Sequence, residues 1–145
     1  MIIRQNYPDK KNAASILDAS SNQMKYTLTL ESNDNSAFNI IRNIYECFRM
    51  LDDALLTAQG IESEDHLAPI HELMKIKVET QRSITLVDHL RRMRHNINYY
   101  GYTPKKEEAD DAVSLAKACF EPLINAVKKE IEKNESFKRM KLKSS

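Results

Sequence analysis

"AFNIIRNIYECFRMLDDALLTAQG", residues 37–60, is the stretch that decides the fold class of this chain. Its large apolar residues recur every three or four positions, which is the spacing of one face of an α-helix. They are Ile40, Ile44, Phe48, Leu51 and Leu55. Gly60 follows at a position where a left-handed glycine commonly ends a helix. We therefore predict a long amphipathic helix over residues 37–59.

Four more helices are predicted from apolar spacing and from residues that favour helix ends. They span about residues 8–31, 65–78, 84–99 and 104–133. Asp65 and Thr103 are the expected N-caps of the third and the fifth helix, and Gly101 ends the fourth. The expected buried stripe of the fourth helix consists of Leu86, Leu90, Met93, Ile97 and Tyr100. That of the fifth helix consists of Ala109, Ala112, Ala116, Phe120, Leu123, Val127 and Ile131.

The composition agrees with a helical fold. Two glycines and four prolines among 145 residues are few for the turns of an all-β protein. Since the connections between the predicted helices are short, neighbouring helices should pack antiparallel. We expect an all-α, up-and-down bundle of about five helices, with residues 1–137 as one domain and a basic, frayed tail at 138–145.

Charge and apolar patterning limit the classes of function. The formal net charge is only +1, so a site for a polyanion must be local. The apolar run at the N-terminus is too short for a signal peptide, and no apolar stretch reaches the length of a membrane span. We expect a cytoplasmic protein without membrane contact, in which Cys47 and Cys119 are buried, reduced thiols.

The segment "LRRMRHNINYYGY", residues 90–102, combines arginine, histidine, asparagine and tyrosine side chains of the kind found in binding or catalytic sites. At helical spacing, Arg91, Arg94, His95 and Asn98 lie along one side, and Tyr99 and Tyr102 are expected at the same end of the bundle. Arginine binds phosphate through paired N–H groups, histidine moves protons near neutral pH, and tyrosine and asparagine stack on or hydrogen-bond a base. The six residues are therefore candidates for an RNA- or nucleotide-binding site.

A structural role for this segment remains an alternative. Cations near a helix C-terminus are favoured by the helix dipole, and in the folded bundle they have Glu46, Asp52 and Asp53 as candidate partners. Other kinds of site are not expected. His66 and His71 are spaced unlike metal ligands on a helix, and two glycines cannot form a phosphate-binding loop. We predict no metal and no cofactor.

Two stretches resemble the HEPN family, the higher eukaryotes and prokaryotes nucleotide-binding domain. They are "NIYECFRMLDDALLTAQGI", residues 43–61, and "LRRMRHNINYYGYTPKKEEADDAVSLAKACFEPLINAVKKEI", residues 90–131. The likeness is to small stand-alone archaeal and bacterial members and covers residues 12–132. It implies a four-helix core plus an extra helix, and a homodimer that places two motif helices across a shared cleft. Members include metal-independent ribonucleases, toxins whose two-gene partner is a minimal nucleotidyltransferase, and non-catalytic RNA- or nucleotide-binding proteins.

The family's ribonuclease motif is an arginine, a polar residue and, four to six residues on, a histidine. In this sequence Arg94 and His95 match the first two, and Tyr99 occupies the histidine position. A phenol, with an ordinary pKa of about 10, is a poor proton shuttle at neutral pH. The resemblance thus implies RNA or nucleotide binding with weak or no catalysis. The alternatives are a metal-independent endoribonuclease, with Arg94, His95 and Tyr99 as catalytic candidates, and a purely structural dimerisation or partner-binding module.

Overall fold

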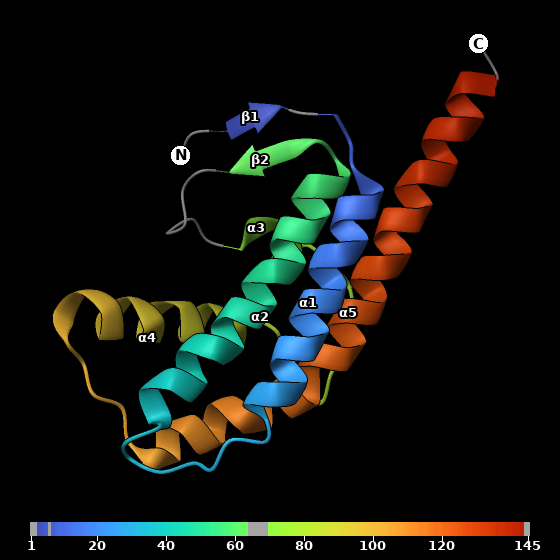
Figure 1. The fold of residues 1–145 in the computed structure, drawn as a ribbon. Coiled ribbons are helices and arrows are strands. Elements are labelled where there is room, and N and C mark those ends of the chain that lie inside the picture. The colour runs from blue at the N-terminus through green and yellow to red at the C-terminus, as the bar shows by residue number, and fades with distance from the viewer. Residues whose placement is uncertain (1–2, 6, 64–69, 144–145) are drawn as a thin grey trace.

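The computed structural model describes residues 3–5, 7–63 and 70–143, with side chains described for 7–61 and 70–133. In this part of the chain five helices form a packed bundle (Figure 1), which confirms the predicted all-α class. The helices are α1 (Lys10–Thr27), α2 (Ala37–Ala58), α3 (His71–Met74), α4 (Leu86–Tyr100) and α5 (Lys106–Lys143). Two short strands, β1 (Ile3–Gln5) and β2 (Ile61–Ser63), were not predicted and pair antiparallel, with Arg4 opposite Glu62.

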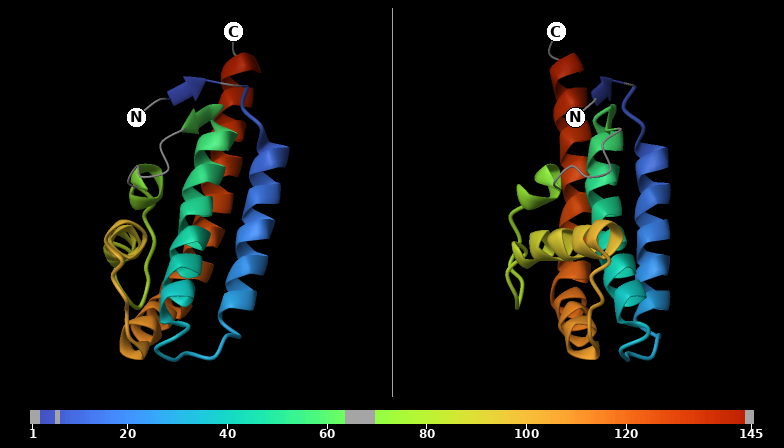
Figure 2. Two further views of the ribbon diagram at one scale, coloured as in Figure 1. Left: turned by 60° about the vertical axis from the view of Figure 1, so that its left-hand side comes forward. Right: turned by 90° about the vertical axis from the view of Figure 1, so that its left-hand side faces the viewer.

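Helix α2 is the centre of the fold. It contacts α1, α5, α4 and α3, and both views of Figure 2 show α1, α2 and α5 running side by side. The predicted stripe of α2 is confirmed, because all five of its apolar residues are buried. The predicted apolar face of α5 is buried as well, and Phe48 and Phe120 meet edge to face with ring centroids 5.6 Å apart.

Both glycines end a helix as predicted. Gly60 has φ 78° directly after the C-cap of α2, and Gly101 has φ 65° at the C-cap of α4. Positive φ is readily adopted only by glycine, so each marks a place where the chain must leave the helical path. The amide of Tyr102 then donates to the Asn96 carbonyl at 3.1 Å, which closes the last turn of α4.

The third helix is much shorter than predicted. α3 covers only His71–Met74, and the expected N-cap Asp65 lies outside the described residues. From Lys75 onward, exposed and half-buried residues alternate, with Ile76 and Val78 packed against the core. That period of two belongs to extended chain and not to helix. The prediction of a helix to Val78 is therefore wrong.

The predicted boundaries of the first and the fifth helix are wrong as well. α1 begins at Lys10, where Asp9 caps it by accepting the Asn12 amide at 2.9 Å, and it ends at Thr27 and not near Glu31. α5 begins at Lys106, after the expected start at Pro104, and its backbone is helical through Lys143 and not only to Lys133. Pro122 lies inside α5 and removes one amide donor, which fits the different direction of the first turns of this helix (Figure 1).

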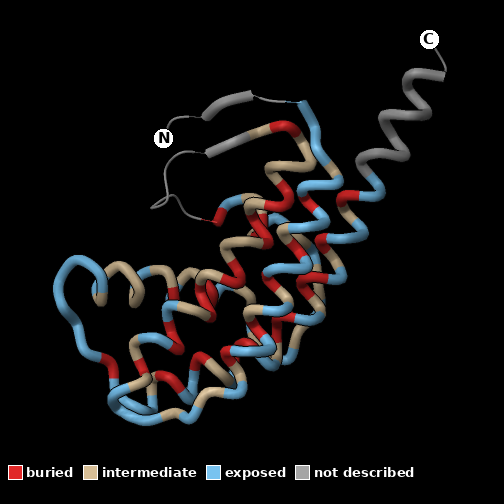
Figure 3. The backbone as a smooth tube through the Cα atoms, viewed as in Figure 1, coloured by how far each residue is buried: buried red, intermediate tan, exposed pale blue. Residues whose placement is uncertain are grey.

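Helix α4 crosses the other long helices instead of running along them (Figures 1 and 2). Val87 and Leu90, near its beginning, are buried, whereas Leu86, Met93 and Ile97 are only partly buried against the core. Tyr100 was predicted to belong to the buried stripe but is 76% exposed. The crossing explains this error, because the C-terminal end of α4 points away from the bundle, and Figure 3 colours that end mainly as exposed and half-buried.

Candidate nucleic-acid interface

The arginines near the middle of α4 are held by neighbours. Arg91 donates from Nε to Oδ1 of Asp88 at 2.8 Å, and Arg92 lies 3.4 Å from the other oxygen of the same carboxylate. The hydrogen bond from Arg91 lowers the pKa of Asp88. The Arg92 side chain remains 71% exposed, so part of its charge faces solvent. Two of the acids suggested as partners, Glu46 and Asp53, bond with Arg49 on their own helix.

Arg94, the arginine of the motif, packs on a buried tyrosine of α2. Its guanidinium carbon lies 5.5 Å from the centroid of the Tyr45 ring, within the range of a cation–π interaction. Tyr45 itself is fully buried. Burial raises the pKa of its phenol to about 12, although Arg94, Arg91 and Arg49 act in the opposite direction. The contact with Tyr45 thus fixes the Arg94 guanidinium against α2.

The Tyr45 hydroxyl has no hydrogen-bond partner within the described residues. A buried polar group without a partner destabilises the folded state, because the group has lost its bonds to water. We expect Tyr45→Phe to raise the free energy of unfolding by about 1–2 kcal/mol. Urea denaturation followed by circular dichroism measures this difference. A lower stability would show that the hydroxyl has a partner in solution.

The outer part of the motif is a cluster of rings at the end of α4. The His95 ring centroid lies 4.8 Å from that of Tyr99 and 5.6 Å from that of Tyr100. Tyr99 is 59% exposed and Tyr100 is 76% exposed, and Asn98, which directly precedes Tyr99 in the sequence, is exposed as well. We call His95, Tyr99 and Tyr100 the ring cluster. It presents aromatic surface to solvent at a place where the chain also carries positive charge.

Tyr102 lies beyond the helix end and is fixed by α5. Its hydroxyl donates to the Glu108 carboxylate, with 2.8 Å to each oxygen, and this bond raises the pKa of the phenol. The same carboxylate accepts the Lys105 amide at 3.1 Å. Tyr102 is still 44% exposed. It therefore offers a ring in a fixed position, next to the first turn of α5.

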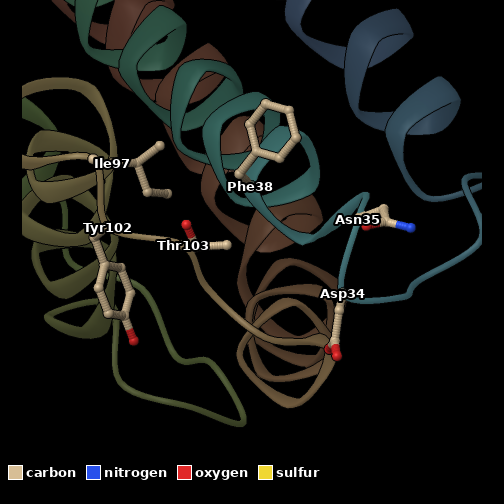
Figure 4. A pocket seen from close by; sticks show the side chains of 7 residues that line it. Asp34, Asn35, Phe38, Ile97, Tyr102 and Thr103 are labelled. Carbon is tan, nitrogen blue, oxygen red and sulfur yellow. The ribbon is translucent and has the colours of Figure 1, made fainter.

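An open pocket of about 370 Å³ lies beside Tyr102. Its lining comes from three parts of the chain: the connection between α1 and α2, the first turn of α2, and the end of α4 with the residues after it. The lining residues are Asp34, Asn35, Phe38, Ile97, Gly101, Tyr102 and Thr103 (Figure 4). The Asp34 carboxylate accepts the Lys106 amide at 2.8 Å and so ties the α1–α2 connection to the start of α5.

The structure thus divides the six predicted site residues into three groups. Arg91 and Arg94 are half-buried and held by Asp88 and Tyr45, respectively. His95, Asn98 and Tyr99 lie at the outer end of α4, and Tyr102 lies by the pocket. Sequence reasoning missed Tyr100, which helical periodicity assigned to the core, and Phe38, whose place in the pocket has no local signal.

No group of three or more histidine, cysteine or acidic side chains suited to a metal is found among the described residues. His71 is exposed, and His66 lies outside the described part. Cys47 and Cys119 are buried and unpaired, as predicted. Within the described residues no helix combines the length and the apolar character needed to cross a bilayer. No known protein family, curated protein or solved structure compared with the chain matches it.

Proposed function

We propose that this chain is a HEPN-like protein that binds single-stranded RNA or a nucleotide through the end of α4, with weak or no catalysis. The observation that carries the proposal is the ring cluster. Exposed aromatic side chains in mutual contact offer flat faces on which unpaired bases stack, and each such contact contributes about 1–3 kcal/mol. In a folded domain, two exposed tyrosine rings gathered around a half-buried histidine at one helix end are better suited to a ligand than to packing within the chain.

Positive charge next to the ring cluster supports the same function. Arg92 and Arg94 both precede His95 closely in the sequence, and the Arg92 side chain is largely exposed. Guanidinium groups beside stacking rings are suited to the phosphates that link the stacked bases. Tyr99, where the family motif has a histidine, provides a stacking face but no ready proton transfer at neutral pH, which is why we propose binding over cleavage.

Binding of a labelled, single-stranded RNA, followed by fluorescence anisotropy with EDTA present, tests the proposal. We expect Tyr99→Ala and Tyr100→Ala each to weaken binding about tenfold, since a lost stacking contact of ~1.4 kcal/mol corresponds to that factor. Arg94→Ala should weaken binding as well and reduce its dependence on salt.

Tyr26→Ala is the matched control, because Tyr26 is a 64% exposed tyrosine on α1. It should leave RNA binding unchanged. An RNA affinity that is unchanged by Arg94→Ala would contradict the proposal. Cleavage of the RNA in EDTA that disappears in an Arg94→Ala, His95→Ala double variant would instead establish the endoribonuclease alternative. The homodimer and the nucleotidyltransferase partner that the resemblance implies stay predictions.

A further inference from the structure

The pocket beside Tyr102 has walls that suit a small, flat ligand. Phe38 and Ile97 provide apolar surface, and Tyr102 provides an aromatic ring. In Figure 4 the Thr103 side chain lies among these three, while the Asn35 amide points away from them. A volume of about 370 Å³ is at the lower end of the range of small-molecule sites, which combine mainly apolar walls with a few polar groups.

The charge of the lining favours a neutral ligand over a phosphate. No lysine or arginine is among the lining residues, and the one ionisable carboxylate, Asp34, already accepts the Lys106 amide. A phosphate placed there would meet a carboxylate and no cation. An uncharged heteroaromatic base avoids this repulsion and gains from the aromatic and apolar walls.

The walls are fixed before any ligand arrives. Glu108 holds the Tyr102 hydroxyl, Asp34 holds the start of α5, and Gly101 has the left-handed conformation that ends α4. A site that is already ordered loses little conformational freedom on binding, which favours affinity. The Thr103 hydroxyl has no hydrogen-bond partner among the described residues, and it can both donate to and accept from the edge of a base.

The pocket adjoins the ring cluster. Gly101 lines the pocket and directly follows Tyr100, and consecutive Cα atoms are only about 3.8 Å apart. We propose that this pocket holds one unstacked nucleobase, packed against Tyr102, Phe38 and Ile97 and hydrogen-bonded by Thr103. The inference rests on the proposed function and deepens it. The ring cluster stacks neighbouring bases of the RNA, and the pocket binds one base that is turned out of that stack.

Two pairs of variants test the pocket, and all four changes are at exposed positions. Thr103→Val removes the hydroxyl at constant shape, and Thr103→Ser is its matched control. Tyr102→Leu removes the ring, and Tyr102→Phe keeps the ring without its bond to Glu108. We expect Thr103→Val to weaken RNA binding about fivefold and Tyr102→Leu about tenfold, with Thr103→Ser close to the original protein. Thermal melting confirms that each variant is folded.

Titration with nucleosides tests whether the pocket binds a base that is not part of an RNA chain. Adenosine, guanosine, cytidine and uridine are titrated separately while the amide signals of residues 97–103 are followed by NMR. A saturable shift with at least one nucleoside, lost in Tyr102→Leu, supports the pocket even if no RNA binds, in which case only the proposed function fails. RNA binding that is unaffected by Tyr102→Leu and Thr103→Val, without nucleoside shifts, overturns the pocket and leaves the proposed function standing.

Discussion

Phe48→Ala is expected to lower the free energy of unfolding by about 3–5 kcal/mol, the range for loss of a large buried aromatic side chain. Phe48 is fully buried on α2 and meets Phe120 of α5 edge to face at 5.6 Å. The substitution therefore removes apolar burial, leaves a cavity and breaks the ring contact that joins the two longest helices. Urea denaturation followed by circular dichroism measures the change.

Phe48→Leu serves as the graded comparison, because it keeps most of the apolar volume and should cost much less than the alanine change. Lys117→Ala, at an exposed position of α5, should leave stability within about 0.5 kcal/mol of the original. A loss below about 1 kcal/mol for Phe48→Ala would mean that α2 and α5 are not packed in solution as described.

Stability is expected to fall as pH rises from about 4 to about 6, because of Asp52. This residue is 7% exposed, and burial raises the pKa of its carboxyl from 3.8 to about 6, although the Leu73 amide, which donates to it at 2.8 Å, acts to lower the value. Between these two values the unfolded chain releases the proton while the folded chain retains it. The folded state loses about 3 kcal/mol relative to its stability below pH 4.

Asp52→Asn removes this titration and keeps an oxygen that accepts the Leu73 amide. We expect the difference in unfolding free energy between the original protein and the variant to change by about 3 kcal/mol across the window from pH 4 to 6. Asp18→Asn, at an exposed position of α1, controls for the loss of one carboxyl group. Parallel stability curves for the original protein and Asp52→Asn would contradict the assignment.

The two proposals for the end of α4 differ in what the sequence could support. The exposed tyrosines and the flanking arginines are contiguous in the chain, so their chemistry is visible as a short motif. The pocket is not visible in this way, because Phe38 and Asp34 come from a segment far from Thr103. Only the packing of α4 and α5 against the beginning of α2 brings them together.

The sequence by itself determined the fold class, the positions of the long helices and the buried faces of α2 and α5. These features follow from local rules: apolar spacing sets the face of a helix, and a glycine with positive φ ends it, at Gly60 and at Gly101. The extended segment after α3 also has a local signal, because polar and apolar residues alternate over Lys75, Ile76, Lys77 and Val78, a period of two that contradicts the predicted helix.

Tertiary structure alone decided how α4 lies, and with it the character of the candidate site. Periodicity places Tyr100 on the same side as Leu90 and Met93, yet no helix among the described residues covers that end, so Tyr100 is exposed and joins His95 and Tyr99. Likewise, Arg94 contacts Tyr45 because α4 crosses α2 at that point. A side chain's angle around its own helix is set by the sequence, whereas its burial depends on which remote element packs over it.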